Sequence, residues 1–108
     1  MTEHDLQNAI RIELTLRGCA VFRTNVGKIR LPDGRIFDTG LPRGFSDLLA
    51  VRGGRAYFVE VKVHPNKPTE EQLHFLDTMR ERYGCAGGVA YSVEDAVRIV
   101  EGGGARDE

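Results

Sequence analysis

The sequence predicts one α/β domain in which a mixed β-sheet is flanked by helices, in the order α-β-β-β-α-β-α. Apolar residues recur at helical spacing near 3–17, 70–83 and 93–101, and short runs rich in Val, Leu, Ile and Phe lie between them. A chain of 108 residues is long enough for one modest domain and too short for two. We expect residues 1–101 to form this domain. Residues 102–108, mostly glycine and charged residues, predict a disordered tail.

The first helix is predicted over about 3–17. Thr2 and Asp5 have the spacing of a capping box, and Gly18 is a typical stop. Glu13 lies in the middle of the apolar face of this helix. An acid in that place either reaches out at the edge of the core or points inward toward a positive charge.

Strands and an irregular loop follow the first helix. Residues 19–24 favour a strand, and residues 28–37 favour a hairpin because Pro-Asp-Gly at 32–34 is strong turn chemistry. Residues 38–46 contain two glycines and a proline and predict irregular structure. This basic loop could hold DNA or could be a plain connection.

The next two strands are the most informative part of the chain. Residues 47–51 and 55–63 are predicted strands, and the two glycines between Arg52 and Arg55 are typical of a two-residue hairpin turn. In that register position 47 lies opposite position 60. Asp47 and Glu60 would then face each other with their Cβ atoms about 4.5–5.5 Å apart. A three-residue loop would instead place one carboxylate on the other face.

Two facing carboxylates repel each other, and their neighbours here are apolar. A hard divalent cation would resolve the conflict, because Mg²⁺ binds carboxylate oxygens and keeps positions for water and phosphate. Side chains alternate along a strand, so Lys62 shares the face of Glu60. The rival interpretations are an Asp47 that caps its own loop, and a Glu60–Lys62 pair on an exposed strand face.

Both faces of this hairpin are largely apolar, which predicts a sheet covered on both sides. The second helix is predicted over about 70–83, with Thr69 and Gln72 at capping-box spacing. Residues 86–91 can then return parallel to the preceding strand, and the third helix is predicted over about 93–101. Gln72 is either only the capping partner of Thr69 or part of a functional site.

Charge and composition limit the possible functions. The net charge is −1, yet residues 11–67 hold eleven Lys and Arg against five Asp and Glu. One basic face could meet phosphates, although ordinary solvated surface explains the pattern almost as well. Cys19 and Cys85 match no zinc or redox spacing and predict two reduced, largely buried thiols. Neither a membrane span nor a signal peptide is recognisable, so we expect a cytoplasmic, intracellular protein.

Taken together, these motifs resemble a known family. The Gly-Phe-Ser-Asp run at 44–47, Glu60 and Lys62 on the next strand, Gln72 at the start of a helix and Glu13 upstream are similar to the PD-(D/E)XK nuclease superfamily. Within it, residues 3–100 resemble the virus-type replication–repair nuclease (VRR-NUC) domain, in a small stand-alone form. Serine precedes the aspartate where the superfamily pattern has proline, and this change adds or removes no carboxylate.

The resemblance implies a restriction-endonuclease-like core and a set of functional residues. Asp47 and Glu60 correspond to carboxylates that bind Mg²⁺ or Mn²⁺, and the Val61 carbonyl to a further metal ligand. Lys62 corresponds to the catalytic lysine, which would position water or stabilise the pentacovalent phosphate. Two helical residues would complete the catalytic set: Glu13, supporting the metal or its water, and Gln72, near the site.

The resemblance also implies a substrate and a partner. We expect a metal-dependent, structure-selective DNA endonuclease that cuts branched DNA, such as four-way (Holliday) junctions, as a homodimer. The alternatives are a flap or single-strand nuclease, a domain that binds nucleic acid without cutting it, and a metal-free interaction module. Phosphate contacts are expected from Arg23, Asn25, Lys28 and Arg43.

Overall fold

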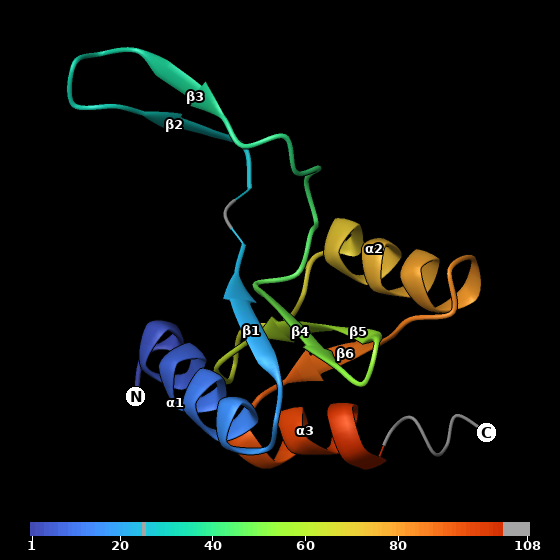
Figure 1. Ribbon diagram of the computed structural model, residues 1–108. Coiled ribbons are helices and arrows are strands. Elements are labelled where there is room, and N and C mark those ends of the chain that lie inside the picture. Colours follow the sequence, from blue (N-terminus) through green and yellow to red (C-terminus); the bar gives the residue numbers. More distant parts are fainter. Residues whose placement is uncertain (25, 103–108) are drawn as a thin grey trace.

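The computed structural model describes residues 1–24 and 26–102 (Figure 1). Residues 103–108 of the predicted tail and Asn25 lie outside this part of the chain, whereas Gly102 ends the last helical turn. The elements in chain order are α1 (Glu3–Leu16), β1 (Ala20–Arg23), β2 (Lys28–Arg30), β3 (Ile36–Asp38), β4 (Leu48–Arg52), β5 (Arg55–Val61), α2 (Glu70–Glu81), β6 (Ala86–Ala90), α3 (Val93–Val97) and the π-helical turn η1 (Arg98–Gly102).

The main sheet is mixed, as predicted. Its strand order is β1-β4-β5-β6, so β1 and β6 are the edge strands. The first three strands are antiparallel to their neighbours, and β6 runs parallel to β5 after the crossover through α2. The parallel pairing follows from the helix between the two strands, because parallel strands need a crossover connection.

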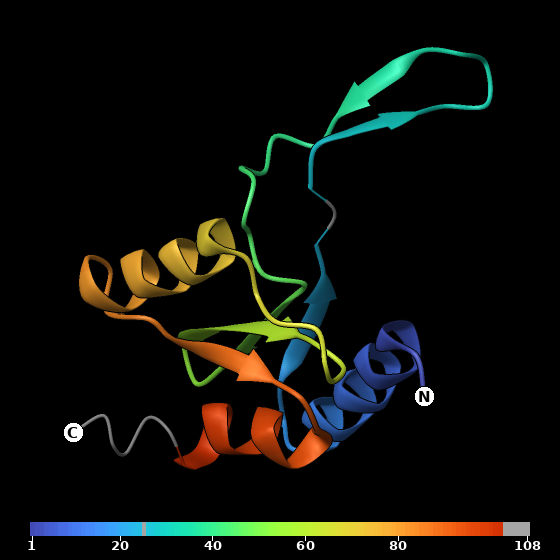
Figure 2. The ribbon, with the colours of Figure 1, turned by 180° about the vertical axis from the view of Figure 1, so that it is seen from behind.

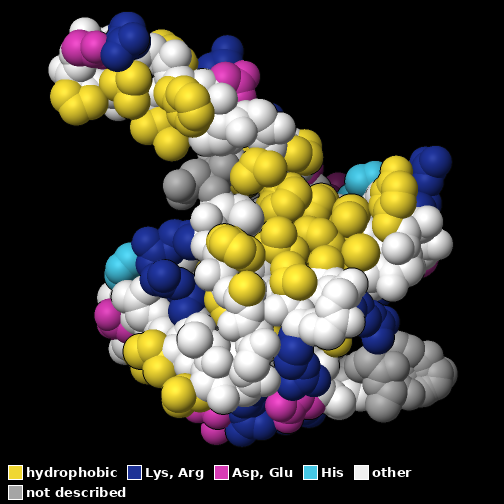
Figure 3. Space-filling model, viewed as in Figure 1, with side chains coloured by type: hydrophobic (Ala, Val, Ile, Leu, Met, Phe, Trp, Pro, Cys, Tyr) yellow, Lys and Arg dark blue, Asp and Glu magenta, His cyan; other side chains and the backbone are white. Residues whose placement is uncertain are grey.

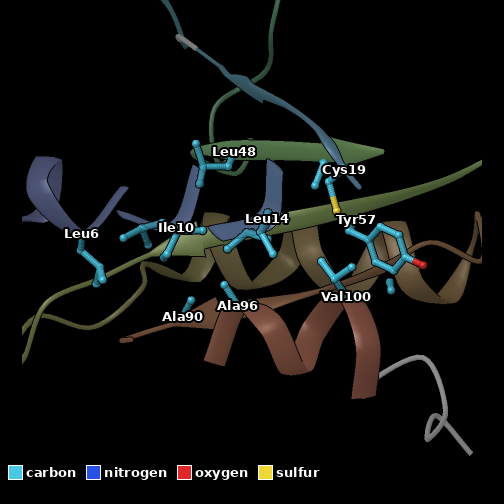
Figure 4. Packing of buried hydrophobic residues seen from close by; sticks show 13 residues of the cluster. Leu6, Ile10, Leu14, Cys19, Leu48, Tyr57, Ala90, Ala96 and Val100 are labelled. Carbon is cyan, nitrogen blue, oxygen red and sulfur yellow. The ribbon is translucent and has the colours of Figure 1, made fainter. Parts of the chain in front are cut away.

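Helices cover both faces of this sheet (Figures 1 and 2). α1 and α3 pack on one face, and α2 lies on the other. The core between the sheet and the α1–α3 layer contains the apolar stripe of α1 and the inward side chains of the strands (Figure 4). Its fully buried members are Ile10, Leu14, Leu48, Ala50, Val59, Val61, Ala90 and Ala96.

A smaller aromatic cluster fills the space under α2. Phe58 of β5 meets Phe75 of α2 edge-on, with ring centroids 5.3 Å apart, and Phe45 packs on both rings. Val59, the next residue along β5, belongs to the core on the opposite face. Because side chains alternate along a strand, Glu60 projects from the same face as Phe58 and therefore toward the α2 side.

Strands β2 and β3 and the turn between them form an arm (residues 28–38) that projects from the domain (Figure 1). The predicted Pro-Asp-Gly hairpin is confirmed, with Ile29 directly opposite Phe37. Both side chains are exposed, Phe37 by 54%. Figure 3 shows hydrophobic side chains along the arm and on the surface between the arm and α2. The arm thus presents apolar surface that its own chain leaves open.

The ends of the helices differ slightly from expectation. Both predicted capping boxes are present, at Thr2–Asp5 and at Thr69–Gln72. The third helix keeps α geometry only over Val93–Val97 and continues as the π turn η1.

Cys19 is buried as expected, but Cys85 is only partly buried, and both are free thiols. Within the described ranges, the structure contains no helix long and apolar enough to span a bilayer.

Candidate active site

The turn between β4 and β5 sets the register of the site. Arg52 pairs with Arg55 and Leu48 pairs with Val59, so the predicted two-residue loop is confirmed. Gly53 and Gly54 both have positive φ, 62° and 79°, which explains why glycine is needed at both places. Continuing this register by one step places residue 47 opposite residue 60.

Asp47 lies in the bend just before β4 and is held by two neighbouring strands. Its backbone carbonyl accepts a hydrogen bond from the N–H of Thr24 at 3.0 Å. Its carboxylate Oδ2 accepts one from the N–H of Val61, at the end of β5, at 2.9 Å. These bonds fix the carboxylate at the point where β4 begins and β5 ends.

Glu60 is a buried carboxyl group beside Asp47. Its side chain is 1% exposed, and within the described residues its Oε1 has no hydrogen-bond partner. Burial raises the pKa of Glu60 to about 8, and the Asp47 carboxylate adds to the rise, while Lys62 opposes it. Two acids so close in an apolar setting favour a shared proton or a bound cation.

Lys62 completes the cluster on the same side of the strand. Its Nζ lies 3.6 Å from Oε2 of Glu60, and its side chain is only 14% exposed. Its backbone N–H donates to the carbonyl of Ala90 at 3.0 Å, which extends the pairing of β5 with β6. The following segment is held by His64, whose ring stacks on Tyr91 with centroids 4.1 Å apart. The backbone at Lys62 and the segment after it are therefore both fixed, and they hold the ammonium group beside Glu60.

The donor set at this point suits a hard cation. Asp47 and Glu60 supply carboxylate oxygens, and one oxygen of Glu60 is buried without a partner among the described residues. The N–H and C=O of one strand residue point to the same edge, so the Val61 carbonyl faces the Asp47 side, as does its N–H. In the described part of the chain, no third His, Cys, Asp or Glu joins them in a cluster able to hold a metal.

Glu13 is not brought to this cluster. Its carboxylate lies 2.7 Å from Nε of Arg17, which also bridges to Glu101 of η1 at 2.8 Å. Glu13 also lines a hollow against α3. The role expected for Glu13 in metal binding gains no support from this position. Glu3, in the first turn, is the acid of α1 that continues the buried stripe of Leu6 and Ile10.

Gln72 acts in the helix cap. Its Oε1 accepts a hydrogen bond from the N–H of Thr69 at 2.9 Å, so this amide oxygen is occupied in the capping box. The loop before Asp47 packs tightly here: a Cβ added at Gly44 would lie 2.5 Å from the carbonyl oxygen of Glu71. The capping role of Gln72 is shown, and a role in the reaction remains a prediction.

The residues expected to contact nucleic acid are spread over the surface. Arg23 and Arg11 share one acceptor, the Oδ1 of Asn8, at 3.0 and 3.2 Å. Arg23 pairs with Leu48 in the sheet, so its backbone lies one register step from Asp47, while its guanidinium group points toward Asn8 of α1. Sequence reasoning named Arg23 and missed Arg11, although the i, i+3 spacing of Asn8 and Arg11 was a usable signal.

The other two described members of that set lie apart from this pair. Arg43 is exposed and lies 3.7 Å from Glu71, and Lys28 is exposed at the base of the arm. Asn25 lies outside the described residues. The phosphate contacts predicted for Lys28 and Arg43 therefore rest on their exposure and charge alone.

Comparison with known proteins identifies the fold. No protein-family model and no curated protein matches the chain. Among solved structures, the chain is similar to one described as a VRR_NUC domain, with a TM-score of 0.66 and 25% identity, over 93% of this chain and 95% of that chain. The chain has the VRR-NUC fold.

The same fold is found in a second solved structure. Archaeoglobus fulgidus Hjc, a Holliday junction resolvase from an archaeal hyperthermophile, matches with a TM-score of 0.55 and 19% identity. That match covers 81% of this chain and 65% of Hjc. In the VRR-NUC fold of this chain, Asp47, Glu60 and Lys62 form one cluster at the junction of β4 and β5.

Proposed function

We propose that this protein is a metal-dependent, structure-selective DNA endonuclease that hydrolyses phosphodiester bonds, with four-way junctions as the preferred substrate. One observation carries the proposal: Glu60 is fully buried beside Asp47, and one of its oxygens has no partner among the described residues. Burying two neighbouring acids is costly unless a proton or a cation balances them. A nuclease needs such a pair to hold a divalent metal ion.

The residues of the cluster would have separate roles in hydrolysis. Asp47, Glu60 and the Val61 carbonyl would hold Mg²⁺ or Mn²⁺, which lowers the pKa of a bound water and offsets the charge of the phosphate. The 2.9 Å bond from Val61 keeps one Asp47 oxygen fixed and leaves the other free to bind. Lys62 would direct its ammonium group at a phosphate oxygen as negative charge builds up there.

The basic pair formed by Arg11 and Arg23 between α1 and the β1 edge of the sheet would hold the DNA backbone. Arg11 and Arg23 are held by Asn8, and no acid lies within ion-pair distance of either in the described part of the chain. Their charge is therefore available for a phosphate of the bound DNA. Glu3 is the acid of α1 that we propose to test in place of Glu13, because it is half-buried in the first turn, away from the ion pairs of Arg17 that occupy Glu13.

A homodimer would suit a branched substrate, because two sites related by a two-fold axis can cut two strands symmetrically. The exposed apolar side chains of Phe22, Ile29 and Phe37 support association, since such surface is usually covered by a partner. Light scattering at micromolar concentration should give the mass of a dimer. Phe37→Ser should shift it toward the monomer, whereas Tyr83→Ser, at another exposed aromatic residue just after α2, should not.

The cutting activity is tested with a panel of labelled DNAs. A four-way junction, a flap, a linear duplex and a single strand are incubated with Mg²⁺, Mn²⁺ or EDTA, and Lys62→Ala serves as the inactive control. We expect cleavage only with metal, and strongest on the four-way junction. Faster cleavage of the flap or the single strand would make that DNA the preferred substrate instead of the four-way junction. If the wild type bound the junction without cleaving it, the proposed nuclease activity would be wrong.

A further inference from the structure

A second basic site lies at the other end of the sheet. A cavity of about 630 Å³ opens where β5 and β6 begin, between the end of α2 and the α3–η1 segment. Three arginines from three different elements line it: Arg55, Arg80 and Arg98. Arg55 is the first residue of β5 and Glu60 is near its end, so the two sites are about 17 Å apart at the usual rise per residue. The cavity is therefore separate from the carboxylate cluster.

The open edge of β6 supplies backbone donors to this cavity. The carbonyl of Ala90 accepts from Lys62 and so faces β5, whereas the carbonyl of Gly87 accepts from Nη1 of Arg80 at 3.2 Å and so faces outward. The N–H of a strand residue points to the same edge as its C=O, and the direction alternates along the strand. The N–H groups of Gly87 and Val89 therefore point outward, and both residues line the cavity.

The three arginines outnumber the carboxylates paired with them by one. Arg80 is paired with Asp77 at 2.5 Å, and Arg98 is paired with Asp95, a carboxylate that also lines the cavity. Arg55 has no carboxylate within 4 Å in the described part of the chain; its guanidinium lies over the Tyr57 ring, 5.7 Å from the centroid. Arg55 is thus the cation whose charge is left for a ligand.

We propose that this cavity binds a phosphate group, carried either by a nucleic-acid backbone or by a free mononucleotide. Guanidinium groups give phosphate paired, charge-assisted hydrogen bonds, and outward N–H groups of a strand edge add further donors. One unbalanced positive charge matches one phosphodiester. Asp95 does not repel the ligand strongly, because Arg98 neutralises it and the N–H of Tyr91 donates to it at 2.9 Å.

The site is tested by ¹⁵N NMR in EDTA, so that no cleavage occurs. Inorganic phosphate, adenosine monophosphate and a short DNA duplex are titrated separately, and the amides of Gly87 and Val89 are followed. We expect saturable shifts of both amides. Arg55→Gln should weaken binding about tenfold, the usual effect of losing a charge-assisted hydrogen bond. Arg82→Gln should not, because Arg82 lies over Tyr83 and is not part of the cavity lining.

The three titrations distinguish the sources of the phosphate. Shifts with phosphate and the mononucleotide assign the site to a free ligand, and shifts with the duplex alone assign it to a nucleic-acid backbone. In the second case Arg55→Gln should reduce the slope of log affinity against log salt by about one. Unmoved amides with all three, or equal affinity in Arg55→Gln and wild type, would overturn the proposal. DNA cleavage, which tests the site formed by Asp47 and Glu60, is measured separately, so either proposal can fail alone.

Discussion

The carboxylate of Asp47 accepts a 2.9 Å hydrogen bond from the backbone N–H of Val61. β4 has not yet begun at Asp47, so this side chain takes the place of a ladder partner for the last residue of β5. The bond couples the end of one strand to the acid that precedes the other. The geometry of the carboxylate pair is therefore built into the pairing of the sheet.

Asp47→Asn should separate structure from chemistry at this position. The amide oxygen of asparagine can still accept the hydrogen bond from Val61, so the free energy of unfolding should change little. Cleavage should fall by about 100-fold or more, because a neutral amide is a poor ligand for a hard cation. Asp47→Ala, which also loses the hydrogen bond, should cost about 1 kcal/mol of stability as well. Full cleavage by Asp47→Asn would remove Asp47 from the metal site.

Glu60 makes stability depend on pH in the absence of metal. The pKa of Glu60 in the folded protein is about 8, above its ordinary value of 4.5. Between these values the folded protein holds a proton that the unfolded chain has released. The stabilising contribution is thus complete below pH 4.5 and is lost as the pH rises toward 8, by up to about 1 kcal/mol per pH unit. Urea denaturation in EDTA from pH 5 to 8 measures this loss.

The matched variant for that measurement is Glu60→Gln, which is neutral at every pH. The unfolding free energy of the wild type minus that of this variant should fall as pH rises, because only the wild type loses the contribution of Glu60. All other titrating groups are shared and cancel in the difference. Adding Mn²⁺ at pH 8 should stabilise the wild type and leave Glu60→Gln nearly unchanged, since a cation favours the ionised carboxylate. A difference that stays constant with pH would contradict the burial of a protonated Glu60.

Lys62→Met tests the charge of the lysine while keeping most of its length. Cleavage should fall by about 100-fold, because the ammonium group is expected to stabilise charge in the transition state. Binding of junction DNA, measured by fluorescence anisotropy in Ca²⁺, should change much less. Lys67→Met is the control, since Lys67 is an exposed lysine a few residues further along. Equal losses of binding and cleavage would make Lys62 a simple phosphate contact.

Gly44 and Gly40 form a matched pair for testing the loop before Asp47. Both have positive φ, 87° and 81°, so alanine is strained at either place. Only at Gly44 would the new Cβ clash, at 2.5 Å from the carbonyl oxygen of Glu71, while Gly40 has open space. Gly44→Ala should therefore lose about 1–3 kcal/mol more stability than Gly40→Ala in urea denaturation. Similar losses in both would show that the loop can move away from α2.

Glu13→Gln and Glu3→Gln test which acid of α1 serves the site. Glu13 is engaged with Arg17 on the α3 side, so its substitution should leave the cleavage rate within about twofold and cost less than about 1 kcal/mol of stability. Glu3→Gln should lower the cleavage rate at least about tenfold with Mg²⁺. The reverse result would restore the role that the family resemblance implies for Glu13.

The cluster of Asp47, Glu60 and Lys62 was predictable because it depends on local signals. Two glycines fix the turn, the turn fixes the register, and the alternation of side chains puts Glu60 and Lys62 on one face. The place of Glu13 relative to this cluster could not be predicted in the same way. Helical spacing shows which residues share a face of a helix, but not which face of the sheet that helix will cover.

The arginine cavity was also hidden from sequence reasoning, for a related reason. Arg55, Arg80 and Arg98 are separated by 25 and 18 residues, and no periodic pattern links them. They meet only because the crossover through α2 makes β6 an edge strand beside β5. A site assembled by topology in this way becomes visible once strand order is known.

The arm formed by β2 and β3 joins β4 of the main sheet through the loop of residues 39–47 (Figure 1). Its strands belong to a sheet of their own, separate from the one that holds the carboxylates. Insertions or deletions in it should leave the register of β4 and β5 unchanged. The arm can therefore change in length or composition while Asp47 and Glu60 keep their positions in the main sheet.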